Sequence, residues 1–208
     1  MYPLIKRLMD ILISLVALVI LLPLNLVVMI LIFIEDGGFP LYSQERVGMH
    51  REHFRFFKFR SMVKNADDLL FSNPKLLNKL RTGNHKLKDD PRITKIGKFI
   101  RKYSIDEVPQ FINVLKGDMS FVGPRPFRPD ELEKYEIKEK KISSAAVDQL
   151  LSVKPGITGL WQTGGRSDVT FDQRVDIELR YVKNCSFMLD LYIILKTPIA
   201  VVQAKGAL

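Results

Sequence analysis

The feature that most constrains this chain is a long apolar stretch close to its N-terminus. Residues 11–34 contain no charged side chain, and nearly every position is apolar. About 20 such residues suffice for a helix to cross the hydrocarbon core of a bilayer. No small-residue cleavage site follows, and the stretch is longer than the apolar region of a secretory signal. We therefore predict a permanent membrane segment rather than a cleaved leader.

Two features argue against a straight spanning helix. Pro23 in the middle of the stretch removes a backbone hydrogen bond and kinks a helix, and Asn25 adds a polar group near the bend. Lys6 and Arg7 precede the stretch, and basic residues recur after it from Arg46 onward. Basic flanks favour the cytoplasm. The residues alone leave two alternatives open: a kinked spanning helix, or a helix–break–helix that enters and leaves through one membrane face.

The net charge of the chain indicates which kinds of molecule it can bind. The chain has 208 residues and a formal net charge of +9, which favours nucleic acid, anionic lipid or a phosphorylated substrate. Because Cys185 is the single cysteine, the chain cannot form an internal disulfide. The histidines lack the companions and spacing of a zinc site. A length of this order fits one substantial domain with an appendage.

An adjacent acid pair, Asp106 and Glu107, is the strongest candidate for chemistry. Ser104 stands three residues before Glu107, the spacing of a capping box, so we predict a helix over residues 105–115 with Asp106 in its first turn. Residues 116–117 (KG) are a helix-stop signal, so we expect this helix to end there. Free N–H groups and the helix dipole would hold that carboxylate ionised. An ionised Asp can act as a nucleophile or bind a metal, and the nearby Arg101 and Arg125 can bind phosphate. A capped helix with ordinary surface acids remains the alternative.

The remaining patterns predict an α+β chain that is mainly helical. Residues 41–62 favour short strands, and helical spacing is found over residues 66–80, 93–103, 130–151, 171–182 and 187–202. Residues 187–202 are too short and interrupted to span a membrane, so they suit an interfacial segment or a core helix. Residues 53–60 alternate aromatic and basic side chains, as in surfaces that stack single-stranded nucleic acid. An amphipathic strand with buried phenylalanines is the commoner cause, and we expect no nucleic acid.

Several motifs in a fixed order carry a resemblance to a known family. Lys6, Arg7 and Asp10 stand before the apolar run. They are followed by residues 58–62 (KFRSM), 90–94 (DPRIT), 104–110 (SIDEVPQ), 113–120 (NVLKGDMS), 121–126 (FVGPRP), 154–162 (KPGITGLWQ) and 165–166 (GR). Together they resemble the bacterial sugar transferase family, the monotopic phosphoglycosyl transferases, over nearly the whole chain.

The resemblance implies how the chain is organised. Residues 1–36 would form a re-entrant membrane anchor, and residues 37–208 a catalytic domain with short strands and interfacial amphipathic helices. The domain would lie on the cytoplasmic face of the bacterial inner membrane, in contact with membrane lipid. The resemblance also allows a homodimer. The alternative, from a different class, is a non-catalytic basic scaffold on the membrane surface that binds anionic lipid or nucleic acid.

The resemblance also implies a reaction and its residues. The family transfers a sugar 1-phosphate from a UDP-sugar to a polyprenyl phosphate, through a phosphosugar–aspartate intermediate, and starts exopolysaccharide or lipopolysaccharide assembly. Asp106 would be the nucleophile and Glu107 its helper, and the pair would hold Mg²⁺ as cofactor. Planar guanidinium groups bind diphosphate well, so Arg101 and Arg125 are the first substrate-binding candidates. The other substrate-binding candidates are Lys58, Arg60, Arg92, Gln162 and Arg166. For the four cations among them, a surface ion pair is the alternative role.

Overall fold

The computed structural model describes residues 2–82, 87, 90–138, 142–164 and 169–203. The longer helices are α1 (Tyr2–Ile20), α2 (Leu22–Asp36), α4 (Pro74–Thr82), α5 (Lys95–Lys102), α10 (Phe171–Asn184) and α11 (Phe187–Gln203). The shorter helical segments are α3 (Ala66–Phe71), α6 (Gln110–Lys116), α7 (Pro129–Leu132), α8 (Ser144–Leu150), α9 (Leu160–Gly164), η1 (Met49–Arg51), η2 (Ile105–Glu107) and η3 (Glu133–Lys138). The strands are β1 (Leu41–Val47), β2 (His53–Phe59), β3 (Ser120–Val122) and β4 (Gly156–Thr158). The predicted mainly helical α+β class is confirmed.

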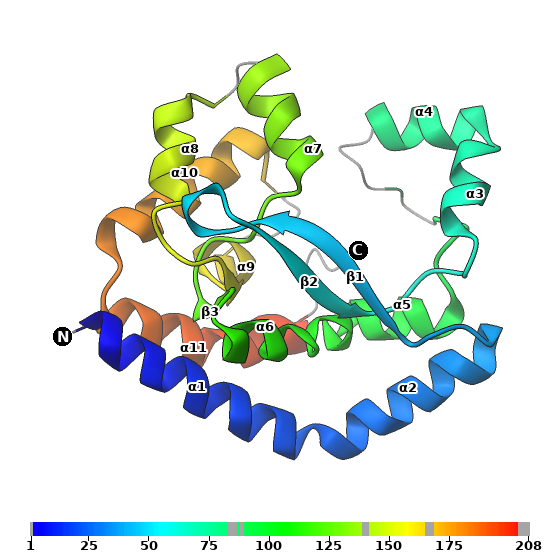
Figure 1. Ribbon diagram of the computed structural model, residues 1–208, viewed down its shortest axis with the longest axis horizontal. Helices are drawn as coiled ribbons and strands as arrows, with labels where there is room; N and C mark the ends of the chain where they lie inside the picture. The colour runs from blue at the N-terminus through cyan, green and yellow to red at the C-terminus, as the bar shows by residue number, and fades with distance from the viewer. Residues whose placement is uncertain (1, 83–86, 88–89, 139–141, 165–168, 204–208) are drawn as a thin grey trace.

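Helices α1 and α2 form a bent pair along one side of the molecule (Figure 1). Their axes differ by 61° at a break of one residue, Leu21. Pro23 lies in the first turn of α2, where proline is well tolerated because its missing N–H needs no intrahelical partner. Among the described residues no single helix is long and apolar enough to cross a membrane, although this pair meets both criteria when taken together. The predicted break is confirmed, and the re-entrant path stays a prediction.

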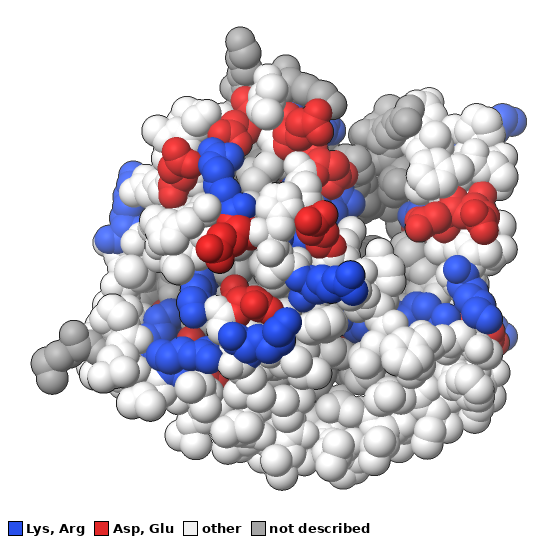
Figure 2. Space-filling model, viewed as in Figure 1, with Lys and Arg blue, Asp and Glu red and all other residues white. Residues whose placement is uncertain are grey.

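The outer surface of the bent pair is apolar. Charged side chains begin above it, so the lower part of the molecule is almost uniformly uncharged in Figure 2. The exposed large apolar side chains of the pair include Leu4, Leu8, Leu12, Val19, Ile20, Leu26, Val27, Ile30, Phe33 and Ile34. Helix α11 adds Met188, Leu195, Ile199 and Val202. An exposed apolar surface of this extent is unusual for a protein surrounded by water and typical of a membrane contact.

The inner surface of the pair packs against the rest of the chain. Val28 and Ile32 of α2 are buried in one apolar cluster with Phe59, Ile100 and Val108. Helix α1 lies against α6 and β3, and α2 lies against α5. The anchor is therefore continuous with the core that carries the acid pair, since Val108 directly follows Glu107.

The four strands in the described part of the chain form two small sheets. β1 and β2 form an antiparallel hairpin with Leu41 opposite Phe59, which crosses above α5 and α6 (Figure 1). β3 and β4 are parallel, with Ser120 opposite Gly156. Phe56 and Phe59 of β2 are buried, so the aromatic run belongs to a packed strand, as predicted. The division into residues 1–36 and 37–208 stays a prediction.

The structure corrects the predicted helix at residues 105–115. Ser104 has a φ of 55° and its side chain caps no N–H group, so the capping box is wrong. Instead the acid pair lies in the single turn η2, and α6 begins after Pro109. The predicted stop at Gly117 is confirmed, because this glycine has the left-handed φ of 92° that ends many helices. Residues 130–151 are also helical in part only, as α7, η3 and α8.

Candidate active site

The acid pair is held at the junction of α5, β2 and α6. Turn η2 follows α5 directly, and the N–H of Glu107 donates to the carbonyl of Ser104. Asp106 is only 6% exposed. A buried carboxylate such as Asp106, with the partly buried Glu107 beside it, needs cationic partners, since an unpaired buried charge is very costly. The alternative of ordinary surface acids is therefore wrong for Asp106.

Two cations from segments that are distant in sequence are the partners of these carboxylates. The Lys58 ammonium at the end of β2 lies 2.9 Å from Oε1 of Glu107 and 3.4 Å from Oδ2 of Asp106. The Arg125 guanidinium, in the loop after β3, donates to the same Glu107 oxygen at 2.9 Å. Lys58 therefore bridges the two carboxylates, and Arg125 reaches the pair through Glu107.

The environment moves the two carboxyl pKa values in opposite directions. Burial raises the pKa of Asp106, and the positive charge of Lys58 opposes this only in part. Burial also acts to raise the pKa of Glu107, but the charges and hydrogen bonds of Arg125 and Lys58 outweigh it and lower that pKa. The capped helix start that was expected to favour the ionised form of Asp106 is therefore absent, because η2 has no capping box, and burial acts in the opposite direction by raising the pKa of this carboxyl. A carboxylate with a raised pKa is more basic, which suits a nucleophile once it is ionised.

The first substrate-binding candidates lie on two sides of the pair. Arg101, in the last turn of α5, donates from Nε to the Ser61 hydroxyl at 2.8 Å. Its charge acts on Asp106 and lowers the pKa of that carboxyl. Arg125 approaches from the opposite part of the chain, through Glu107. The structure therefore brings Lys58, Arg101 and Arg125 together with the acid pair.

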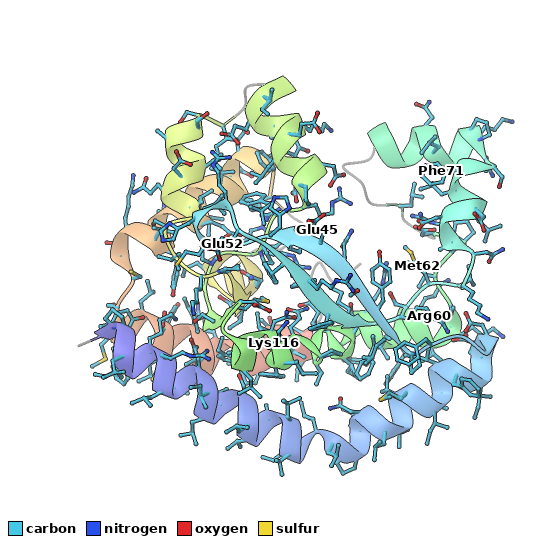
Figure 3. All side chains as sticks on the ribbon, in the orientation of Figure 1. Glu45, Glu52, Arg60, Met62, Phe71 and Lys116 are labelled. Atoms are coloured by element: carbon cyan, nitrogen blue, oxygen red, sulfur yellow. The ribbon has the colours of Figure 1, made fainter. Side chains whose placement is uncertain are left out.

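The second-rank candidates lie in other contacts. Arg60 pairs with Asp36 at the end of α2, where β2 meets the anchor (Figure 3). Arg92 makes a bidentate pair with Asp90, and both side chains are buried. Both guanidinium groups thus form ion pairs, as the alternative role predicted, but these pairs are largely covered and do not lie on the surface. Neither guanidinium makes a hydrogen bond or ion pair with the acid pair among the described contacts.

The last two candidates lie in the glycine-rich segment around α9. Gln162 is buried within α9. A Cβ placed on Gly159, just before α9, would come within 2.4 Å of the backbone carbonyl oxygen of Gly123, so this position needs glycine. Arg166 lies outside the described residues.

A buried charge network behind Arg125 was not predicted. The Glu178 carboxylate accepts the backbone N–H of Arg125 at 2.8 Å. Arg174, one turn earlier on α10, donates to Glu178 at 3.3 Å and to the carbonyl of Arg125 at 3.3 Å. Its guanidinium also pairs with Glu131 at 2.9 Å and lies over the Trp161 ring. Both backbone groups of Arg125 are thereby held by one ion pair of α10.

The same region carries an excess of positive charge. Burial and the charge of Arg125 lower the pKa of Arg46 to about 9, with Arg128 and Arg174 adding to the effect. The charges of three other arginines thus act on Arg46, and an anionic ligand near it would reduce this repulsion. The i,i+4 spacing of Arg174 and Glu178 was the only sequence signal for this network, and such pairs are common on helix surfaces.

The donor set of the acid pair is compatible with magnesium. Both hydrogen bonds to Glu107 go to Oε1, which leaves Oε2 available beside Asp106. Mg²⁺ is commonly held by one or two carboxylates together with substrate phosphates. The described residues contain no group of three or more His, Cys, Asp or Glu side chains placed to hold a metal. The protein could therefore supply two ligands at most here, and the phosphates of a substrate would supply others.

Two surface hollows lie away from this site. One of about 490 Å³ is formed by the β1–β2 hairpin around Gln44 and Arg55. Another of about 300 Å³ lies beside Lys116 and Lys154, near the end of α6 (Figure 3). Neither is lined by the acid pair, so we identify the site by its charged groups and not by a cavity.

The fold and the site define a class: a mainly helical α+β protein with an extended apolar surface and an acid pair among cations that suit phosphate. The family model for bacterial sugar transferases matches residues 1–204, and the chain belongs to this family of transferases. The exopolysaccharide production protein ExoY of Sinorhizobium fredii is 43% identical over 97% of this chain and 87% of its own length. The undecaprenyl-phosphate galactose phosphotransferase of Salmonella typhimurium is 45% identical over 97% of this chain and 41% of its own.

A third relative has another sugar in its name. The UDP-N-acetylgalactosamine-undecaprenyl-phosphate N-acetylgalactosaminephosphotransferase of Aeromonas hydrophila is 38% identical over 99% of this chain and 45% of its own length. The chain thus spans less than half of two of these relatives. Relatives of similar identity differ in the sugar they are named for, so similarity alone does not identify the sugar here.

Proposed function

We propose that this protein transfers a sugar 1-phosphate from a UDP-sugar to a polyprenyl phosphate. The observation that carries the proposal is the buried acid pair, whose pKa values diverge and whose partners are Lys58 and Arg125. Relatives named for undecaprenyl-phosphate sugar transfer support the substrate class. Membership of a transferase family favours this reaction over the non-catalytic scaffold.

The reaction proceeds in two steps. An oxygen of the ionised Asp106 carboxylate attacks the sugar-bearing phosphorus, and the bond from this phosphorus to the bridging oxygen breaks. UMP leaves with the bonding electron pair, and a phosphosugar remains on Asp106. A phosphate oxygen of the polyprenyl acceptor then attacks the same phosphorus and releases the carboxylate. Two steps let a water-soluble donor and a lipid acceptor use one site in turn.

The surrounding residues bind and orient the phosphates. Arg125 and Arg101 hold diphosphate oxygens, and Lys58 moves between the carboxylates and the developing negative charge, as cations do at phosphoryl groups. Glu107 keeps Lys58 and Arg125 in position. Glu107 and Asp106 are the residues that would hold Mg²⁺, which would supply positive charge to the substrate phosphates.

The bent pair places this chemistry at the membrane. Its apolar outer surface enters one leaflet and returns, and the acid pair stays at the level of the headgroups, where the acceptor phosphate lies. Basic flanks keep the catalytic residues on the cytoplasmic face of the inner membrane. The product starts the assembly of a bacterial polysaccharide.

The test is UMP release from a panel of UDP-sugars by the full chain in lipid nanodiscs. We expect release with at least one donor, and its loss in Asp106→Ala, while Asp106→Ala still fractionates with membranes. Without acceptor, the wild-type protein gains the mass of one sugar phosphate, which maps to Asp106 after proteolysis. Full UMP release by Asp106→Ala would contradict the assignment of the nucleophile.

A further inference from the structure

Asp10 is a buried carboxylate for which the reaction has no direct use. It lies in α1, just before the uncharged part of the membrane segment, and is only 4% exposed. Its Oδ1 accepts two hydrogen bonds, from the Ser120 hydroxyl at 3.0 Å and from the N–H of Phe121 at 2.8 Å. A single carboxylate oxygen of α1 thus accepts hydrogen bonds from the first two residues of β3.

Lys6, one helical turn earlier, holds the other end of the same strand. Its ammonium donates to the carbonyl of Val122 at 2.9 Å and pairs with the buried Asp190 of α11. Arg7 beside it donates to the carbonyls of Val114 and Leu115 at the end of α6. The polar residues of α1 therefore contact the two elements that flank the active site, β3 and α6.

A short and stiff connection joins β3 to Arg125. Only Gly123 and Pro124 separate Val122 from Arg125. The N–H of Gly123 donates to the carbonyl of Thr158, and the carbonyl of Pro124 accepts from Gly156. A Cβ on Gly123 would come within 2.5 Å of the carbonyl oxygen of Lys154, so this segment packs directly on the backbone that precedes β4 and follows β3 as one stiff unit. A displacement of β3 is therefore transmitted to Arg125.

We propose that Asp10 is a positioning residue for Arg125, so that the anchor is part of the donor site and not only an attachment to the membrane. This rests on the proposed function for its readout, since Arg125 is argued to bind the donor diphosphate. The geometry distinguishes the role of the oxygen from that of the charge: both bonds use Oδ1 alone. An asparagine offers the same oxygen without the charge.

The first experiment measures UMP release by the full chain in nanodiscs, with the donor found active for the wild-type protein. We expect Asp10→Ala to lower kcat/KM about 10- to 100-fold, mainly through a higher donor KM, because small displacements of a binding group have effects of this size. Asp10→Asn should stay within about threefold of wild type, since it keeps the acceptor. Leu12→Ala, on the exposed apolar side of the same helix, is the control and should match wild type.

The second experiment is a double-mutant cycle with Arg125→Ala. If Asp10 acts through Arg125, the double variant Asp10→Ala/Arg125→Ala is no worse than Arg125→Ala alone, because coupled sites are not additive. A general structural defect would instead multiply the two losses and overturn the proposal. Ser120→Ala, which removes one of the two bonds, should show a smaller loss than Asp10→Ala and keeps the test available if Asp10→Ala does not fold.

Each outcome decides a different claim. Wild-type activity in Asp10→Ala, or an Asp10→Asn as impaired as Asp10→Ala, would overturn the positioning role while the transferase stands. If the wild-type protein releases UMP from no donor, the proposed function fails first, and the positioning role fails with it. The positioning role and the proposed function are both supported by three results together: Asp10→Ala loses activity, Asp10→Asn keeps it, and Asp10→Ala causes no further loss when it is added to Arg125→Ala.

Discussion

At the residue scale, Lys58 is the group that links the two carboxylates. It contacts both of them, whereas Arg125 bonds only Glu107. Glu107 therefore receives two hydrogen bonds to one oxygen, and Asp106 receives one long contact. This asymmetry explains why adjacent acids in one turn have pKa values that move in opposite directions. It also separates their roles, with the less compensated carboxylate left free to react.

Lys58→Met tests this electrostatic arrangement. Removing the cation raises the pKa of Asp106 further, and the reaction needs the ionised form. The acidic limb of the pH profile for kcat/KM should therefore move to higher pH, in addition to a loss of rate at every pH. Measuring UMP release from pH 5 to pH 9 gives the pH at which the acidic limb of the profile lies. Lys64→Met, at an exposed lysine, should leave the profile where it is, and an unmoved limb in Lys58→Met would contradict the role of Lys58.

Glu178→Gln tests the buried network behind Arg125. Burial raises the pKa of Glu178 to about 7, against the opposing charges of Arg174 and Arg125. A carboxyl whose pKa is raised on folding favours the folded state below its ordinary pKa, and this contribution is lost as pH rises through the folded value. Gln cannot ionise, so wild type should lose about 3 kcal/mol relative to Glu178→Gln between pH 4 and pH 8.

The measurement for Glu178→Gln is the thermal midpoint of both proteins in detergent at several pH values. The difference in midpoint should change in favour of Glu178→Gln as pH rises. A difference that is constant with pH would show that Glu178 ionises with an ordinary pKa.

At the element scale, α5 connects the anchor to the acid pair. The Glu35 carboxylate at the end of α2 accepts the N–H groups of Lys95 and Ile96, where the positive end of the helix dipole favours an anion. Gly97 in the first turn lies so close to β2 that an added Cβ would come within 2.0 Å of the carbonyl oxygen of Ser61. The same Ser61 receives the hydrogen bond of Arg101. The close approach of α5 to the end of β2 therefore sets the position of Arg101.

Gly97→Ala should separate these two elements. Because the obstacle is backbone, the helix has to move, and overpacking of this kind costs about 1–3 kcal/mol. We expect a lower thermal midpoint and a loss of UMP release through displacement of Arg101. Gly164→Ala is the matched control, since a Cβ there meets nothing within 4 Å. Equal behaviour of the two variants would contradict the packing argument.

At the scale of the whole molecule, the bent pair decides the membrane topology. A bend of 61° between α1 and α2 and an apolar outer surface fit a segment that enters and leaves one leaflet. We expect reporter tags at residue 1 and residue 208 to be accessible from the cytoplasm only. Pro23→Leu restores a helical N–H and favours a continuous helix, which at about 1.5 Å per residue is long enough to cross the bilayer. A fraction of that variant should expose its N-terminal tag on the outside.

A periplasmic N-terminal tag in the wild-type protein would contradict the re-entrant path. A tag that stays cytoplasmic in Pro23→Leu would show that the contacts of α1 and α2 with the domain hold the bend without proline. Leu24→Ala is the control, because it changes a side chain beside the break and keeps Pro23.

The local patterns of the chain were enough to predict the apolar segment with its break, short strands within residues 41–62, helix α5 and the stop at Gly117. Each of these depends on residues that are neighbours in sequence: periodicity, proline and glycine act over a few positions. Tertiary contacts alone decided the pKa directions of Asp106 and Glu107, because Lys58 is 48 residues away from Asp106 in sequence. They also assigned Arg60 and Arg92 to ion pairs and joined Asp10 to β3, at a separation of 110 residues. Burial and charge act through space, and no window of sequence contains the side chains that meet there.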